Sequence, residues 1–279
     1  NTAPGRRLER RVACENSVVI IEWLQSITTS CPTDWRRMGY LHQAIGINAR
    51  YHRHQKAWQT HIDNSQKFIL NAADNCERKR KVVLMGAAAL HDLPVRALAE
   101  QFDEVILVDL FHLWSTRWLA FTTPNIKLEV CDLTASLADT SAGSTDNSIP
   151  GAYLDDDDVD LVVSANIASQ LPLIPIEWLK QTSKIDADQS YRFGQKIINA
   201  HFEYLGQFSA TVCLICDLER MTTDQTGSEL SRISALFDLP APEHQASWTW
   251  DIAPLGEINK KQATSHIVIA SVMSQNSDI

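Results

Sequence analysis

The residues best placed to do chemistry follow short apolar runs, at the points where strands would end. Gly86, Asp109 and Asp132 each come directly after such a run, and Ser164 closes a fourth one. In an open sheet of parallel strands, ligands bind at the carboxyl ends of the strands. The four positions therefore predict one binding site, assembled from segments that are far apart in the sequence.

The first wall of this site is predicted to be the loop Gly86–Asp92, with sequence GAAALHD. A glycine after a strand lets the backbone approach a ligand, and the start of the following helix favours anionic groups. His91 could act as a general base near neutral pH. The alternative is structural: His91 would be a partly buried residue at a helix start, with Asp92 as the helix cap.

Two acids follow the next two apolar runs. Asp109 comes roughly 20 residues after the glycine, a spacing at which a carboxylate can accept both hydroxyls of a ribose. Asp132 could accept a hydrogen bond from the exocyclic amine of adenine. For both acids the alternative is a helix cap, and Asp132 could also be a solvated loop residue.

Beyond the fourth run, Asn166 and Gln170 can donate or accept hydrogen bonds without carrying charge. They lie where a bound group would face its reaction partner. The alternative is that they begin a helix and pack.

The elements that position these residues alternate between short strands and helices. The five predicted strands that lead into helices or loops are Lys81–Gly86, Glu104–Asp109, Asn125–Asp132, Val159–Ser164 and Thr211–Cys216. Two last strands, Trp248–Ala253 and His266–Val272, have no helix between them. The pattern predicts an α/β fold with a Rossmann-like, seven-stranded, mostly parallel sheet that ends in an antiparallel strand pair. A helix is predicted over Ser228–Phe237.

The first part of the chain is predicted to be helical from Leu8 to about Ala73, with a break at Pro32–Asp34. We expect an N-terminal helical segment over residues 1–80 and an α/β domain over residues 81–279. A helix bearing Tyr51–His54 and Trp58 could cover a pocket, although exposed charge beside a core tryptophan explains the same pattern.

Composition narrows the classes of partner. The net charge is -9 and the pI about 5.4, so binding to a phosphate backbone is disfavoured. No apolar run approaches the ~18 residues that span a bilayer, and no signal peptide is visible, so we expect a cytoplasmic protein. The six cysteines have no disulfide-scaffold spacing, and Cys213 and Cys216 lie in a predicted core strand. Asp155–Asp158 lacks the spacing of a calcium loop, so no metal site is expected.

At these segments the chain resembles the class I S-adenosylmethionine-dependent methyltransferases. Val82–Gly86 resembles the family's first motif, and Val105–Asp109 resembles its second strand with the ribose acid. Glu129–Asp132 is similar to the segment with the adenine-side acid, and Asp160–Asn166 is similar to the fourth strand. Similarity to a bacterial methyltransferase-like family of uncharacterised proteins is carried by Gly86–Pro94, Ser164–Asn166 and Ala253–Glu257.

The resemblance implies S-adenosylmethionine as cofactor and a small molecule or a protein side chain as methyl acceptor. The residues expected to bind the cofactor are Gly86, Ala87, Ala88, Asp109, Leu110, Asp132, Leu133 and Ser164. The candidates for a direct role in the reaction are His91, Asn166 and Gln170. The sequence indicates neither the identity of the acceptor nor the oligomeric state.

The chain departs from the family in its glycine loop. Ala88 and Leu90 stand where the family usually has its second and third glycines, and the Cβ of Ala88 narrows the space for the methionine part of the cofactor. One alternative is therefore a binding or interaction module that kept the fold without catalysis. Another is an NAD(P)-dependent oxidoreductase that uses Asp109 for ribose, against which the terminal strand pair weighs.

Overall fold

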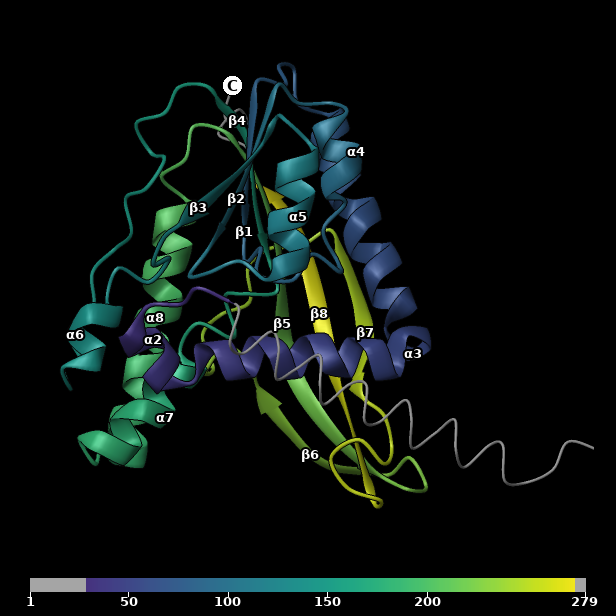
Figure 1. Ribbon diagram of the computed structural model, residues 1–279. Helices are drawn as coiled ribbons and strands as arrows, with labels where there is room; N and C mark the ends of the chain where they lie inside the picture. The colour runs from purple at the N-terminus through teal and green to yellow at the C-terminus, as the bar shows by residue number, and fades with distance from the viewer. Residues whose placement is uncertain (1–28, 274–279) are drawn as a thin grey trace, which may run out of the picture.

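A computed structural model describes residues 29–273, which form one mixed sheet covered by helices (Figure 1). The strands are β1 (Lys81–Met85), β2 (Glu104–Asp109), β3 (Ile126–Val130), β4 (Val159–Ala165), β5 (Thr211–Asp224), β6 (Glu229–Ser234), β7 (Ala246–Ala253) and β8 (Gln262–Met273). Their order is β3-β2-β1-β4-β5-β8-β7, with β6 paired to β5. Strands β1 to β5 are parallel, whereas β8 is antiparallel to β5 and β7 is antiparallel to β8. The predicted fold class and the terminal antiparallel pair are confirmed.

Helices cover both faces of the sheet, so the parallel strands are apolar on both sides. The helices are α2 (Thr33–Met38), α3 (Tyr40–Asp74), α4 (Val95–Ala99), α5 (Trp114–Thr122), α6 (Leu137–Ser141), α7 (Leu173–Thr182) and α8 (Ala187–Leu205). Along β1, Val82 and Leu84 join a hydrophobic cluster with α3 and α4. Val83 and Met85 alternate with them and join a second cluster with α8. None of these helices is both long and apolar enough to cross a membrane, in the part of the chain described.

Helix α3 bends at His54, whose φ of -125° and ψ of 27° lie outside the helical range. Its first half crosses in front of the sheet, and its second half runs alongside α4 (Figure 1). In the second half, Trp58 and Ile69 belong to the same hydrophobic cluster as the sheet residues. The division into segments at residue 80 stays a prediction, and the helix expected from Leu8 lies mostly outside the described residues.

The helix predicted over Ser228–Phe237 is wrong, because this segment contains strand β6. Strand β5 does not stop at Cys216 but continues to Asp224, and β6 pairs with its outer half as a hairpin. The turn is fixed by Asp224, whose carboxylate accepts hydrogen bonds from the backbone N–H groups of Thr226 and Ser228. Gly227 takes a positive φ of 85° there. Strand β6 is therefore an eighth strand, in addition to the seven expected.

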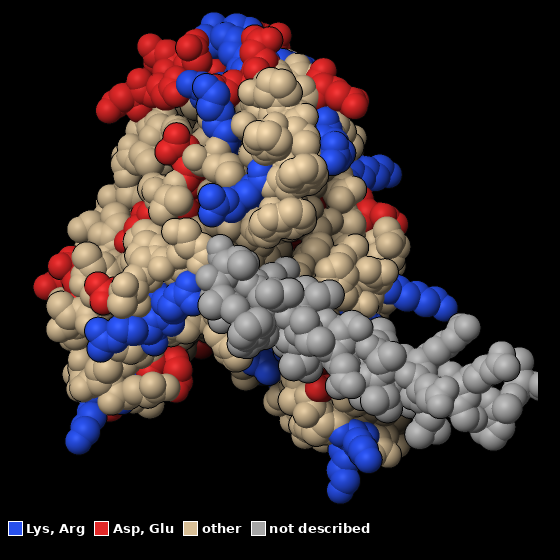
Figure 2. All heavy atoms as spheres, in the orientation of Figure 1, with Lys and Arg blue, Asp and Glu red and all other residues tan. Residues whose placement is uncertain are grey.

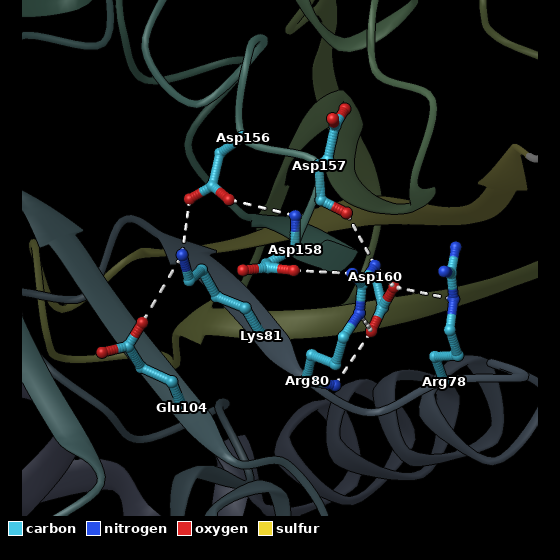
Figure 3. A network of polar contacts seen from close by, with 8 residues as sticks. All are labelled: Arg78, Arg80, Lys81, Glu104, Asp156, Asp157, Asp158 and Asp160. Atoms are coloured by element: carbon cyan, nitrogen blue, oxygen red, sulfur yellow. Dashed lines mark hydrogen bonds and ion pairs between the residues drawn. The ribbon is translucent and has the colours of Figure 1, made fainter.

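The acidic run near residue 156, just before β4, packs against basic residues at the amino end of β1 (Figure 3). Arg80 binds the carboxylates of Asp158 and Asp160 at 2.6 and 2.7 Å, and Lys81 Nζ lies 2.5 Å from Asp156 Oδ2. Acidic and basic side chains gather together at this end of the molecule (Figure 2). The run is thus an ion-paired support of the sheet, and no group able to hold a metal ion occurs among residues 29–273.

Candidate functional site

A cavity of about 210 Å³ lies at the carboxyl ends of the parallel strands, beneath the first half of α3. Its walls come from the loops that follow β1, β2, β3 and β4, together with parts of α3 and β7. The predicted site residues that line it are Gly86, Ala88, His91, Asp109, Leu110, Asp132, Leu133, Asn166 and Gln170. The structure therefore brings together the four strand ends that the sequence singled out.

Two of the expected residues do not line this cavity. Ala87 is fully buried in the hydrophobic cluster on the α3 side of the sheet. Ser164 is also fully buried, and its hydroxyl lies 2.9 Å from Nε2 of His201 on α8. Both residues support the loops from behind, and a direct contact with a ligand remains a prediction for them.

The glycine loop is fixed by contact with the loop after β4. Gly86 has a φ of 84°, in the left-handed region, and a Cβ there would meet Ile167 Cγ2 at 2.1 Å. Only glycine satisfies both conditions. The φ of Ala88 is not positive, so the backbone at this position does not need a glycine. A glycine here would differ from Ala88 only in lacking the Cβ.

Asp109 holds the glycine loop against β2. Its Oδ2 accepts a hydrogen bond from the backbone N–H of Ala88 at 2.9 Å, and its Oδ1 accepts one from Leu110 at 2.7 Å. Helix α5 begins at Trp114 with no side-chain cap, so Asp109 is not its cap. Burial raises the pKa of Asp109 from 3.8 to about 6. The group is thus a carboxylate at neutral pH, and because the backbone N–H of Phe111 also acts on it, about one of its four lone-pair sites is left.

Asp132 is occupied by its own loop. Its carboxylate accepts hydrogen bonds from the backbone N–H groups of Thr134, Ser136 and Leu137 and from the Thr134 hydroxyl. A carboxylate has about four lone-pair sites. Ser136, not Asp132, is the N-cap of α6, so these bonds fold the loop around the acid. The hydrogen bond to adenine remains a prediction that requires sharing of an acceptor.

The His91-Asp92 pair does not begin a helix. Helix α4 starts two residues after Leu93, with Pro94 at its N-cap, so Asp92 is not the cap that the structural alternative required. The ring of His91 stacks on Tyr51 with centroids 3.7 Å apart, and its Nε2 lies 2.9 Å from Asn48 Oδ1. Burial lowers the pKa of His91 to about 4, so the ring is neutral at pH 7. Asp92 instead turns toward the amide of Asn166.

Local sequence patterns did not identify several residues that α3 and β7 contribute to the walls. Tyr40, Ile47 and His61 come from α3, and Trp250 comes from β7. The one signal that pointed here was the hypothesis that a helix bearing Trp58 covers a pocket, and Trp58 does line the cavity.

The basic residues near the bend of the same helix contact Glu257. Arg50 Nε, Arg53 Nη2 and His54 Nε2 surround the carboxylate of Glu257, in the loop between β7 and β8, at 3.2, 2.6 and 2.7 Å. They fasten the bend of α3 to that loop.

The charged side chains on the described walls of the cavity are all acidic. Its walls carry three carboxyl groups, from Asp92, Asp109 and Asp132, and no lysine or arginine among the described residues. The two histidines, His61 and His91, have pKa values lowered to about 4, mainly by burial. Such a cavity attracts a cation and repels an anion near neutral pH.

Comparison with known proteins gives only distant structural similarity. No known family profile and no curated protein matches the chain. The 1,6-didemethyltoxoflavin-N1-methyltransferase of Burkholderia thailandensis is similar over 88% of this chain and 92% of its own, at 11% identity and a TM-score of 0.38. The YcgJ protein of Bacillus subtilis is similar over 80% and 100%, at 11% identity and a TM-score of 0.35. At this level of similarity, function has to be argued from the site.

Proposed function

We propose that the protein is an S-adenosylmethionine-dependent methyltransferase. The observation that carries the proposal is the charge of the cavity, which has three carboxyl groups and no lysine or arginine among the residues described. S-adenosylmethionine carries a sulfonium cation, so its net charge is opposite to that of these walls. A nicotinamide dinucleotide carries an anionic diphosphate, which such walls repel.

The residues present fit this cofactor in their chemistry. Asp109 offers the acceptor capacity that remains on its carboxylate to a ribose hydroxyl. Gly86 leaves no Cβ between the loop and the cavity floor. Leu133 and Leu171 give the neighbouring wall an apolar surface that suits a purine ring.

When bound, the cofactor supplies an electrophilic methyl group. Methyl transfer needs alignment of donor and acceptor and exclusion of water more than a nucleophilic side chain. The first half of α3 contributes Tyr40, Ala44 and Ile47 to the cavity wall and so limits the access of water. Gln170, on the wall after β4, offers an amide that can orient the acceptor, and Asn166 contacts the neighbouring Asp92.

Calorimetric titration with S-adenosylmethionine, S-adenosylhomocysteine and NAD tests the proposal. We expect saturable binding of the first two and none of NAD. Asp109→Ala should weaken binding, whereas Asp251→Ala, which changes an exposed aspartate on β7, should not. Binding of NAD alone would support the oxidoreductase alternative. Binding of none at millimolar concentration would support a non-catalytic module.

A further inference from the structure

A chain of buried hydrogen bonds ends at the carboxyl group of Asp92 on the cavity wall. Trp248 Nε1 donates to His61 Nδ1 over 3.0 Å, and His61 Nε2 lies 3.1 Å from the side-chain amide of Asn166. The same amide contacts Asp92 Oδ2. The exposed fractions of His61 and Asn166 are only 1% and 6%. The four groups therefore have to satisfy one another rather than solvent.

The donors and acceptors fix where the protons lie. An indole N–H can only donate, so His61 Nδ1 must accept from Trp248, and the proton of the neutral ring sits on Nε2. This N–H needs an oxygen, so Asn166 must present Oδ1 to it. The opposite orientation would set two donors against each other, the Nε2–H of His61 and the N–H₂ of Asn166.

This orientation also makes Asp92 a stronger proton acceptor. Asn166 Oδ1 then faces Asp92 Oδ2, and the repulsion between the amide oxygen and the ionised carboxylate is relieved when the carboxylate takes up a proton. Trp248 and His61 thus stabilise the protonated form of Asp92 through Asn166. A carboxylate in this position binds a proton more tightly than one in water.

The surroundings act in the same direction. Burial is the largest influence on the pKa of Asp92 and raises it, and the charge of Asp217 adds to the effect, whereas an N–H donated by Asn166 would lower it. Asp217 lies 3.0 Å from Nδ1 of His266, on β8, and these two are the other titratable groups packed behind His61. His91 faces the same cavity as a neutral ring.

The wall around Asp92 is aromatic and aliphatic. The His61 ring stacks on Trp250 with centroids 4.0 Å apart and planes 8° from parallel, and Trp58 meets Trp250 edge-on at 4.9 Å. Ile47 and Ile62 complete this side. Flat rings bind well against such surfaces. The lack of lysine and arginine on the described walls gives no partner to a negatively charged ring.

We propose that this side of the cavity binds an uncharged aromatic ring bearing a weakly acidic O–H or N–H group, and that Asp92 accepts its proton. This inference rests on the proposed methyltransferase function. The acceptor oxygen or nitrogen forms a bond to the methyl carbon, and the carbon–sulfur bond breaks with its electron pair left on sulfur. The O–H or N–H proton passes to the Asp92 carboxylate, which becomes a carboxylic acid hydrogen-bonded to Asn166. Asp92 is a catalytic residue in this step, and His61 and Trp248 are positioning residues.

Ligand pairs that differ only in the acidic proton test the acceptor class. With the protein saturated by S-adenosylhomocysteine, we would titrate phenol against anisole, 2-naphthol against 2-methoxynaphthalene, and indole against 1-methylindole, with benzoate as the charged control. The protic member of at least one pair should bind at least about tenfold more tightly than its partner, because it hydrogen-bonds a charged group. Benzoate should not bind. Asp92→Asn should remove that preference without changing the affinity for S-adenosylhomocysteine, and Asp251→Asn should change neither.

Carboxyl ¹³C NMR tests the proton relay without any acceptor. The Asp92 signal, assigned by its loss in Asp92→Asn, should titrate above the ordinary value of 3.8. Trp248→Phe removes a donor outside the cavity, which frees His61 to change tautomer and Asn166 to turn its N–H₂ toward Asp92. The midpoint should then fall, as it should in His61→Phe.

The outcomes separate the two proposals. If S-adenosylhomocysteine does not bind, the methyltransferase proposal itself fails. If it binds but no pair shows a preference, or benzoate binds as well as phenol, the acceptor class is wrong. If Asp92→Asn weakens S-adenosylhomocysteine instead, the carboxylate serves the cofactor. If Trp248→Phe leaves the Asp92 midpoint unchanged, the relay is wrong.

Discussion

Asp109 joins two functions in one carboxylate, because it holds the glycine loop and faces the cavity. We predict that Asp109→Ala weakens S-adenosylhomocysteine binding by about 1.5–3 kcal/mol, the contribution of a hydrogen bond to a charged group. The measurement is calorimetry on a variant whose circular dichroism shows an intact fold. Unchanged affinity would remove Asp109 from the site.

The raised pKa of Asp109 makes that binding depend on pH. Its carboxylate is charged above a pKa of about 6 and protonated below it. The dissociation constant for S-adenosylhomocysteine should therefore rise as the pH is lowered through 6, since a neutral carboxyl is a weaker acceptor. Asp109→Ala should lack this transition. The histidines on the cavity wall do not produce it, because their pKa values are near 4.

Ala88 tests how much the bulk of one methyl group matters. Its N–H bonds Asp109 and its carbonyl accepts from the Thr116 hydroxyl, and both bonds survive in Ala88→Gly. We predict tighter binding of S-adenosylmethionine, together with a loss of stability of about 0.4–1 kcal/mol from the freer unfolded chain. Titration and thermal melting of one sample measure both. Equal affinity in the two proteins would show that the ligand does not approach this Cβ.

At the scale of elements, the bend of α3 is fastened by Glu257. Its carboxylate is surrounded by Arg53, His54 and Arg50, which lower its pKa from 4.5 to about 2, with Arg53 the largest cause. The fastening is fully present above pH 4.5 and is lost as the pH falls toward 2. We predict that Glu257→Gln increases hydrogen exchange in residues 40–54 and speeds release of S-adenosylhomocysteine.

The matched control for this fastening is Glu229→Gln. Glu229 also binds an arginine, Arg232 at 2.7 Å, but it lies on the exposed hairpin strand β6. Its exchange effect should stay within β5 and β6. Equal protection of residues 40–54 in wild type and Glu257→Gln would mean that packing alone holds the bend.

The ion pairs at the other end of the sheet should affect stability without affecting ligand binding. Asp160 is nearly buried, and Arg80 donates to it from its backbone N and from two guanidinium nitrogens. Arg80→Gln should lower the free energy of unfolding by about 1–3 kcal/mol, because it leaves a charged group poorly paired. Arg78, which is 71% exposed and 3.8 Å from Asp160, should contribute below about 1 kcal/mol. Urea unfolding of Arg80→Gln and Arg78→Gln compares the two, and a large change in S-adenosylhomocysteine affinity in either would contradict the separation.

At the scale of the whole molecule, the sheet could be predicted from local patterns, because apolar residues recur with one period in β-strands and with another in helices. The short apolar runs and the absence of a helix before the last strand were sufficient to predict the parallel strands and the antiparallel end. The hairpin over β6 was missed because its residues are exposed and carry little hydrophobic pattern. Its turn residues, Asp224 and Gly227, were the available signal.

The site could be predicted only in part. Its loops follow strands, so the rule for carboxyl ends located Gly86, Asp109 and Asn166. His61 and Trp248 meet across 187 positions of sequence. No local spacing encodes such a contact, and the state of Asp92 depends on it. Sequence patterns therefore identified the floor of the cavity, whereas its roof and its proton chemistry required the three-dimensional structure.

The fastening of α3 also has a consequence for biosynthesis. Arg50, Arg53 and His54 precede their partner Glu257 by 207, 204 and 203 residues. A ribosome adding roughly 5–20 residues per second releases the basic residues about 10–40 s before the carboxylate that binds them. Trp250, which forms part of the same wall, also emerges late. During that interval the aromatic surface of α3 has no native partner on β7, so a nascent chain exposes it to chaperones until the last hairpin is made.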